Sequence, residues 1–266
     1  ADPMTEAAVK SVPADAGGIV SALTAGGPVP FAGIDVIACR IFGEPVLFAV
    51  DMKHDPVQRN HRRGRFYEAR ELEMIRRNLR PGGVFVDIGA NTGNHSLFVA
   101  RFLHPARVIP FEPNPRAWRL LIANMVLNGC LERCDLSHLG RGVGAASAEG
   151  FGMEPRERNL GAAKMLAGEG TISVITGDAA LAGIHPDVIK IDVEGMELEV
   201  LAGLAATLER ARPVLLVEVD TANETEFRDW AASTGYEVAA TNQRYRANRN
   251  HLLRPVRVAE RTGETR

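Results

Sequence analysis

The chain has 266 residues, of which 45% are hydrophobic and 24% charged, and its 31 basic and 33 acidic residues leave a formal net charge of −2. This length and composition predict one α/β domain with a substantial core, and the charge gives no general attraction to nucleic acid or to an anionic membrane. No apolar run reaches the roughly 20 residues of a membrane span, and the basic-then-apolar order of a signal peptide is missing. Three cysteines match neither a disulfide framework nor a zinc pattern, so we expect packed thiols and a cytoplasmic location.

The N-terminal part divides into segments of different composition. Residues 1–3 precede Met4 and are interpreted as a cloning remnant, and residues 4–65 are expected to form an N-terminal segment. Within that segment, residues 4–33 are rich in Ala, Gly and Pro with little periodicity, which predicts a loose stretch. Residues 34–50 carry apolar and β-branched runs around a Gly-Glu-Pro sequence, which is typical of a β-hairpin.

The main domain is expected to span residues 66–258, followed by a tail at residues 259–266. Apolar residues at helical spacing predict a first helix from Phe66 to Leu79, which Pro81 ends. Beyond Gly83 the pattern alternates between strands and helices. Strands are predicted at 84–88, 107–112, 136–143, 187–191 and 213–219, and helices at 93–103, after Asn114 to Gly129, at 196–209 and at 227–233.

The end of the domain favours a second hairpin, formed by Tyr236–Ala240 and His251–Val258. The Gly-rich stretch 145–175 shows no regular pattern. Because strands and helices otherwise alternate at a short pitch, the sequence predicts a doubly wound, mostly parallel sheet of the Rossmann-like kind, with a C-terminal hairpin.

Residues 84–93, VFVDIGANTG, predict a tight turn between the first strand of this sheet and the next helix. Gly89 and Gly93 let the backbone turn sharply and approach a ligand closely, and the amides around Asn94 can hold a carboxylate at the start of the helix. Asp87, at the strand end, can accept hydrogen bonds from an ammonium group. Together these groups suit the zwitterionic methionine part of S-adenosylmethionine.

Glu112 ends the second strand, where a carboxylate can bridge the two ribose hydroxyls of a nucleoside. Nicotinamide-binding proteins share this feature, so the loop decides between the two ligands. It has the form D-x-G-x-x-x-G rather than G-x-G-x-x-G, and Asp87 would repel a pyrophosphate but stabilise an ammonium. The sequence therefore favours S-adenosylmethionine over NAD. His95, alone early in the helix, is interpreted as a packing residue.

A second group of charged residues follows the strand at 187–191, which runs into K-I-D-V-E-G. Lys190, Asp192 and Glu194 share one side of this strand, and Glu218 ends the next strand. Three interpretations stay open. Asp192 or Glu218 could act as the base that removes a proton from a hydroxyl acceptor; the carboxylates could hold a divalent metal that acidifies this hydroxyl; or Lys190 pairs with an acid while Glu194 caps the helix at 196.

Taken together, these residues resemble the FkbM family of methyltransferases. The motifs that carry the resemblance are PGGVFVDIGANTGNHSLFVA, VIPFEPNP, DVIKIDVEGMELEVLAGL and LLVEV, with FYEARELEMI upstream and Gly235-Tyr236 late in the chain. The resemblance covers roughly residues 66–254. It implies a class I methyltransferase fold, S-adenosylmethionine as donor and, usually, O-methylation of a hydroxyl group on a sugar or secondary metabolite. It also implies cofactor contacts at Tyr67 and Glu68, placed on a helix that folds over the site.

The sequence thus predicts an O-methyltransferase acting on a small hydroxylated acceptor, such as a sugar, a glycolipid or a polyketide-type metabolite. An amine acceptor and a non-catalytic nucleotide-binding scaffold are the alternatives. Asn159–Gly161 could line the acceptor pocket. The expected catalytic residues are Asp192, Glu218, Lys190 and Glu194, and a divalent metal is possible among them. The expected cofactor-binding residues are Glu68, Asp87, Gly89, Asn91, Gly93, Asn94, Glu112 and Asn114.

Overall fold

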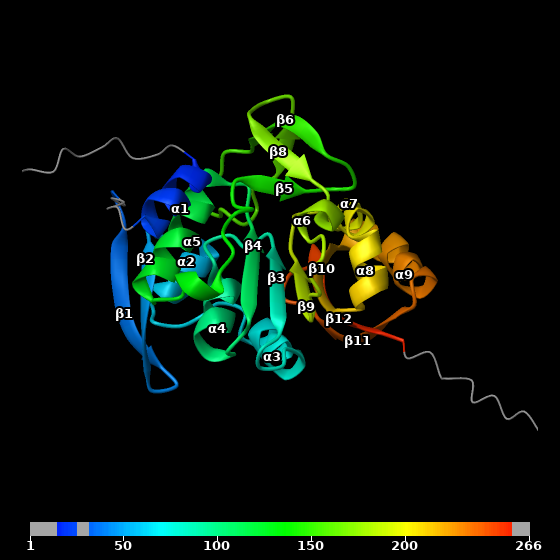
Figure 1. Cartoon of the computed structure of the whole chain (residues 1–266), viewed down its shortest axis with the longest axis horizontal. Helices are drawn as coiled ribbons and strands as arrows, with labels where there is room; N and C mark the ends of the chain where they lie inside the picture. The colour runs from blue at the N-terminus through cyan, green and yellow to red at the C-terminus, as the bar shows by residue number, and fades with distance from the viewer. Residues whose placement is uncertain (1–14, 26–31, 257–266) are drawn as a thin grey trace, which may run out of the picture.

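A computed structural model describes residues 15–25 and 32–256, and its centre is a six-stranded sheet (Figure 1). In spatial order the strands are β11 (Tyr236–Asn242), β12 (Asn248–Pro255), β10 (Val214–Asp220), β9 (Val188–Ile191), β3 (Val84–Ile88) and β4 (Arg107–Phe111). Strands β10, β9, β3 and β4 run parallel, whereas β12 is antiparallel to β10 and β11 is antiparallel to β12. The predicted mostly parallel sheet with a C-terminal hairpin is therefore confirmed.

Apolar side chains alternate across the parallel strands and build a core on each face of the sheet. Phe85 and Val188 belong to one core, and their neighbours Val86 and Ile189 belong to the other. The first core is covered by α3 (Ala69–Asn78), α4 (Asn94–Phe102) and α5 (Pro115–Leu127). The second is covered by α6 (Gly177–Ala180), α7 (Glu197–Gly203), α8 (Ala205–Ala211) and α9 (Glu224–Ser233). Helices on both faces of a parallel sheet define the doubly wound fold.

The chain changes direction across the sheet at β3. It first passes from β3 to β4 on one side and later returns to β9 on the other side of β3. In doubly wound folds ligands bind outside the carboxyl ends of the strands at such a switch point. The turns that follow β3 and β9 therefore define where a site is expected.

A second, smaller sheet lies over this end of the parallel strands (Figure 1). Its order is β5 (Arg141–Val143), β8 (Ile172–Ile175), β6 (Ala148–Met153) and β7 (Met165–Ala167). Strands β6, β7 and β8 lie in the stretch 145–175, where the sequence shows no regular pattern. Strand β5 corresponds to the last residues of the strand predicted at 136–143, and the rest of that prediction is not a strand. Gly152 fits against the carbonyl oxygen of Glu169, which would lie 2.7 Å from a Cβ atom at this position.

The N-terminal elements pack beside α5 (Figure 1). Strands β1 (Asp35–Ile41) and β2 (Glu44–Val50) pair antiparallel within the range where the sequence predicts a hairpin, and α2 (Pro56–His61) follows. Helix α1 (Ala16–Thr24) corrects the interpretation of residues 4–33 as loose, because Asp15 caps it and Ile19 is buried in the core. The remnant predicted at residues 1–3, the tail predicted at 259–266 and the end of the second hairpin lie outside the described residues.

Two helices differ from the expected bounds. The helix predicted from Phe66 begins at Ala69, because Glu68 has a φ of +57° and cannot continue a helix, so Tyr67 and Glu68 precede α3. The helix predicted over 196–209 is divided into α7 and α8 at Leu204, where φ is −106° and ψ is 4°. The break lies next to Gly203, which packs directly against the carbonyl oxygen of Gly144.

Two short 3₁₀ turns, η1 (Leu131–Arg133) and η2 (Thr221–Asn223), complete the fold. Cys39, Cys130 and Cys134 are free, as the sequence predicts. None of the helices within residues 15–25 and 32–256 combines the length and apolar character that crossing a bilayer requires.

Candidate active site

The turn after β3 depends on residues in the left-handed region of backbone conformation. Gly89, Asn91 and Gly93 have φ values of +79°, +50° and +82°. A Cβ atom at Gly89 would overlap the carbonyl oxygen of Asp192, so this glycine lets the turns after β3 and β9 touch. A Cβ atom at Gly93 would lie 2.8 Å from Leu121 Cγ, which shows that this glycine serves helix packing.

Asp87 is fully buried and already has a cation. One carboxylate oxygen lies 3.1 Å from Lys190 Nζ, and the other accepts a hydrogen bond from Ser96 at 2.7 Å. Burial alone would raise the pKa of Asp87, but Lys190, His95 and Ser96 outweigh it and hold this pKa below its usual value. The sequence places Asp87 against a ligand ammonium, whereas in the structure Asp87 lies outside the cavity lining and its cation is Lys190, which does line the larger cavity.

Lys190 therefore holds parts of the site together. Its Nζ also donates to the carbonyl oxygen of Gly89 at 3.1 Å and lies 3.8 Å from Asp192 Oδ2. Burial lowers the pKa of Lys190, but Asp87, Asp192 and Glu68 together raise it above its usual value. The ammonium is thus held charged between the turns after β3 and β9.

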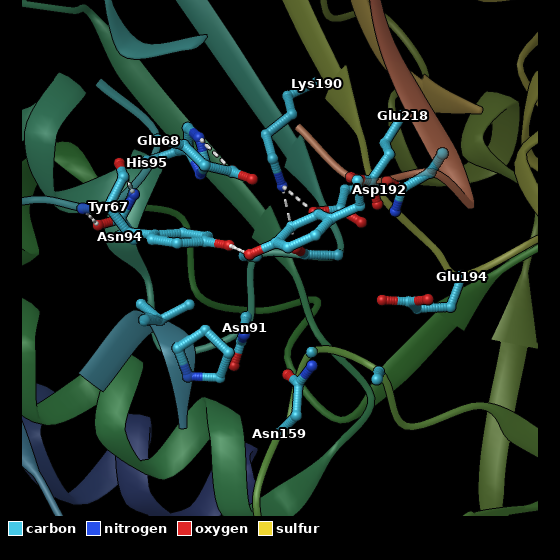
Figure 2. Close-up of a pocket in the computed structure, with 18 of the residues that line it drawn as sticks. Tyr67, Glu68, Asn91, Asn94, His95, Asn159, Lys190, Asp192, Glu194 and Glu218 are labelled. Atoms are coloured by element: carbon cyan, nitrogen blue, oxygen red, sulfur yellow. Dashed lines mark hydrogen bonds and ion pairs between the residues drawn. The ribbon is translucent and has the colours of Figure 1, made fainter. Parts of the chain in front are cut away.

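Two adjoining cavities open at the carboxyl ends of these strands. The larger has a volume of about 260 Å³ and is lined by carboxylates, amides and tyrosines, many of which Figure 2 shows. The smaller, about 70 Å³, is lined largely by apolar side chains. The residues common to both walls are Gly89, Asn91, Gly161, Asp192 and Glu194.

Glu112 lies in the wall of the smaller cavity, at the end of β4 as predicted. Its two carboxylate oxygens accept hydrogen bonds from the amides of Asn91 and Asn114, each at 2.8 Å. Burial raises the pKa of Glu112 to about 7 despite these two donors. The walls around it are built mainly from Ile88, Phe111, Val143, Met153, Leu160, Met165, Val193 and Met196.

Three carboxylates gather in the larger cavity, two from the turn after β9 and one from the last part of β10. Asp192, Glu194 and Glu218 each offer an oxygen within 4.8 Å of the others, and Figure 2 shows their side chains facing one another. Burial and the nearby Asp192 raise the pKa of Glu218, and the same two causes raise the pKa of Glu194 to about 7. The interpretation of Glu194 as a helix cap is wrong, because Met196 is the N-cap of α7 and has no side-chain capping bond.

Glu68 and His95 form a second polar pair in the same cavity. Glu68 Oε2 lies 3.4 Å from His95 Nε2, and both side chains are more than nine-tenths buried. Burial lowers the pKa of His95 to about 3, so the imidazole is neutral at physiological pH. Burial and Asp192 raise the pKa of Glu68. His95 therefore faces the cavity, which differs from its interpretation as a packing residue.

Two predicted cofactor contacts are used inside the protein. The side-chain oxygen of Asn94 accepts a hydrogen bond from the amide of Tyr67 at 2.9 Å and lies 3.0 Å from His61 Nε2. Asn94 therefore lines the cavity but holds neighbouring segments together. Asn114 caps α5 through the amide of Arg116 and lies outside both cavity linings. The predicted ligand contact of Asn114 therefore has no support from the cavity walls.

Several wall residues escape the sequence interpretation. Tyr245 reaches the larger cavity from the connection between β11 and β12, and Asn248 reaches it from the start of β12. The Tyr245 hydroxyl lies 2.9 Å from that of Tyr67. Arg244 stacks 4.4 Å over the Tyr67 ring. No motif around residues 244–248 indicates a site in the sequence. Asn159 and Gly161 line the cavity as the sequence suggests.

Comparison with known proteins adds a family to this geometry. Residues 87–238 match the family model described as the methyltransferase FkbM domain. The chain is 31% identical over 151 residues to the hexuronic acid methyltransferase AglP of Haloferax volcanii, a match that covers 54% of this chain and 59% of that protein. It is 27% identical over 161 residues to the methyltransferase sdnD of Sordaria araneosa, covering 48% and 62%. The matched part thus spans less than two thirds of either relative.

Among solved structures, the FkbM methyltransferase of Methylobacillus flagellatus KT is 16% identical, with a TM-score of 0.47 over 68% of this chain and 50% of that chain. At this distance the fold assignment depends on the strand order itself. That order and the cavities at its switch point define a doubly wound α/β protein of the ligand-binding kind. Since the family match covers more than half of its residues, the chain belongs to the FkbM methyltransferase family.

Proposed function

We propose that this protein is an S-adenosylmethionine-dependent methyltransferase that methylates a hydroxyl group of a sugar or a similar small molecule. The observation that carries the proposal is the pair of adjoining cavities with unlike walls at the switch point. One is largely apolar and has Glu112 in its own wall, and the other is lined by carboxylates, amides and phenols; Asp192 and Glu194 belong to both. This division suits a reaction between a nucleoside donor and a hydroxylated acceptor.

The smaller cavity is assigned to the nucleoside end of the donor. Its apolar walls, which include Phe111 and Val143, suit a purine ring, and Glu112 is placed to accept hydrogen bonds from ribose hydroxyls. Gly89 and Asn91, shared by both cavities, lie where the donor would pass from one to the other. When bound, S-adenosylmethionine supplies a methyl group on a sulfonium, which is already an activated electrophile.

The ammonium of the donor is assigned to Glu68. Because Asp87 is paired with Lys190, it has no free carboxylate oxygen directed into the cavity. Glu68 lies beside the start of α4, lines the larger cavity and shares its surroundings with the neutral His95. A cation bound next to Glu68 would stabilise its ionised form against the burial that now disfavours it.

Asp192 is assigned the role of general base. It lies where the two cavities join, and its neighbour Glu218 has a raised pKa, so Glu218 retains its proton at neutral pH. As the oxygen–methyl bond forms, the acceptor hydroxyl gives its proton to a carboxylate oxygen of Asp192. Lys190, 3.8 Å away, holds this carboxylate in place, and the protonated Glu218 shares a hydrogen bond with it.

The acceptor is assigned to the larger cavity beyond Asp192. Asn159, Asn248 and Tyr245 provide amide and phenol groups, and such planar polar and aromatic side chains suit a polyhydroxylated ring. The relative AglP is named for methylation of a hexuronic acid, which supports a sugar acceptor. An amine acceptor would use the same carboxylate base and is the alternative within this chemistry.

A divalent cation is the second use that the carboxylates allow. Asp192, Glu194 and Glu218 offer three oxygens of the kind that Mg²⁺ prefers, and water would have to complete its six ligands. A cation there would lower the pKa values of Glu218 and Glu194 and acidify a bound hydroxyl. Lys164 and Arg156, which act electrostatically on Glu194, oppose this arrangement.

The test is transfer of a labelled methyl group from S-adenosylmethionine to methyl β-D-glucuronide, methyl β-D-glucoside and glucosamine, each with and without EDTA. We expect the label on a sugar oxygen. Asp192→Asn should lose methyl transfer, and the control Asp229→Asn, at an exposed helix position, should transfer the methyl group as well as wild type. Label on the glucosamine nitrogen alone would replace the O-methyl assignment. Transfer that EDTA abolishes and Mg²⁺ restores would replace the carboxylate base with the metal. Absence of S-adenosylmethionine binding would overturn the proposal.

A further inference from the structure

Asp55 is a buried carboxylate that the proposed reaction does not use. It is fully shielded from solvent, and its two oxygens accept hydrogen bonds from amides far apart in the chain. One oxygen accepts from Gln58 at 3.0 Å and caps α2, and the other accepts from Leu160 at 2.9 Å. Ion pairs within the described residues do not include Asp55, so amide donors alone compensate its charge.

Both partners of Asp55 continue directly into the wall of the larger cavity. Pro56 and Val57 follow Asp55, and Asn159 and Gly161 flank Leu160, and all four residues line this cavity. Asp55 therefore fixes two parts of this wall to each other, although they lie far apart in the chain. Figure 2 shows Asn159 and Asn91 on the side of the cavity opposite Lys190, where this wall lies.

The loop that carries Asn159 has few other attachments. Residues 154–164 connect β6 to β7, and Glu154 and Lys164 close it with a backbone bond of 2.8 Å. Among the described residues, the bond from Leu160 to Asp55 is the only hydrogen bond that joins this loop to the chain outside the β6–β7 hairpin. The Leu160 side chain adds a small apolar contact with Met52 and Ala117.

A helix cap alone does not explain a carboxylate at this position. Ser, Thr or Asn can cap a helix as well as Asp, and a neutral side chain is less costly to bury. A carboxylate has two oxygens, and each can accept a hydrogen bond from a different amide. A serine side chain, with its single hydroxyl oxygen, is too short to reach the amides of both segments. Burial raises the pKa of Asp55, which is the expected consequence of retaining this group inside the protein.

We propose that Asp55 is a positioning residue for the methyl acceptor, which holds the loop 154–164 against α2 so that Asn159 and Gly161 form the acceptor wall. The inference rests on the proposed function for the identity of the cavity, but the tie between the two segments does not. Asp55 touches neither substrate; it acts through the backbone of Leu160. Its loss is expected to weaken acceptor use more than donor binding, because the loop also gives Leu160 and Gly161 to the smaller cavity.

The test compares Asp55→Ser with wild type. Serine keeps the cap of α2 but is too short to reach Leu160 as well. Hydrogen–deuterium exchange of the full chain should show faster exchange in residues 154–164. The acceptor kcat/KM, measured with methyl β-D-glucuronide, should fall about tenfold or more, because the loop loses a charge-assisted bond. The Kd for S-adenosylhomocysteine should rise by a clearly smaller factor than the acceptor kcat/KM falls, because only Leu160, Gly161 and Ala163 of the loop line the smaller cavity.

Two further variants separate positioning from a general loss of stability. Asp55→Asn retains one accepting oxygen and should recover part of the acceptor kcat/KM. Asp178→Ser removes a carboxylate that similarly ties α6 to the amides of Ala206 and Thr207, away from both cavities, and should leave both constants unchanged. Unaltered exchange in residues 154–164, or equal losses in donor Kd and acceptor kcat/KM, would overturn the role of Asp55. If wild type transfers no methyl group but the exchange changes as expected, the proposed function fails and the tie itself remains.

Discussion

Lys190 Nζ lies 3.1 Å from Asp87 Oδ1 and 3.8 Å from Asp192 Oδ2, so one buried ammonium joins the turn after β3 to the carboxylates after β9. Asp87 and Lys190 are almost fully shielded from solvent, whereas Asp192 is partly exposed in the cavity. Asp87 thus supports the site from outside the cavity lining, and the more exposed carboxylate of Asp192 faces the cavity.

The first effect of removing Lys190 should therefore be a lower stability of the folded protein. Lys190→Met leaves the Asp87 carboxylate buried without a cation, which is expected to lower the free energy of unfolding by about 3–5 kcal/mol. Urea unfolding followed by circular dichroism measures this change. The double variant Lys190→Met with Asp87→Asn should regain part of it, because no charge is then stranded. A loss below about 1 kcal/mol in the single variant would contradict the burial of this pair.

Gly89 should be intolerant of any side chain. Gly89→Ala places a Cβ atom onto the carbonyl oxygen of Asp192 and imposes a positive φ on alanine. Gly168 has nearly the same φ, +78°, but open space around it, so Gly168→Ala isolates the backbone cost, which is about 1 kcal/mol. We expect Gly89→Ala to exceed this cost clearly in thermal unfolding and to lose binding of S-adenosylhomocysteine. Equal melting temperatures for the two variants would mean that the two turns are not in contact.

The buried Glu112 predicts a pH dependence of stability. Its pKa is raised from 4.5 to about 7 in the folded protein, so the folded state holds this proton more tightly than the unfolded chain does. The resulting stabilisation is fully present below about pH 4.5 and is lost as the pH rises through about 7. Glu112→Gln carries no titrating group here and should remove this part of the dependence.

The measurement is the difference in unfolding free energy between wild type and Glu112→Gln across this pH range. Wild type should lose roughly 1–3 kcal/mol more than the variant on going from pH 4.5 to 8. A difference that stays constant with pH would show that Glu112 ionises normally.

Much of the fold can be predicted because its strands are continuous apolar runs. Val84–Ile88 and Val214–Asp220 are buried on both faces of a parallel sheet, and such strands need no alternation to be recognised. The small sheet cannot be predicted in this way. Its strand β6, AEGFGM, has only partly buried or exposed residues, and its glycines are needed for close approach of other segments rather than for a periodic pattern.

The site divides in the same way between local and long-range information. Glu112, Asp192 and Glu218 can be placed from sequence, because each lies at or near the carboxyl end of a recognisable strand and parallel strands end at one edge. The partner of Asp87 cannot, since Lys190 reaches it from a strand 103 positions later. Tyr245 reaches the cavity because the β11–β12 hairpin ends there, which no local pattern around it specifies.

The most direct test of the division between donor and acceptor cavities is Asp192→Asn, measured for both binding and turnover in the same preparation. Asparagine keeps the shape of the wall but cannot accept a proton. The account predicts that S-adenosylhomocysteine binds with a Kd within about twofold of wild type by isothermal titration calorimetry, while methyl transfer falls by about 10²–10⁴-fold. Full turnover in this variant would contradict the assignment of Asp192 as the base, and loss of donor binding with the fold intact would place the donor, not the acceptor, against it.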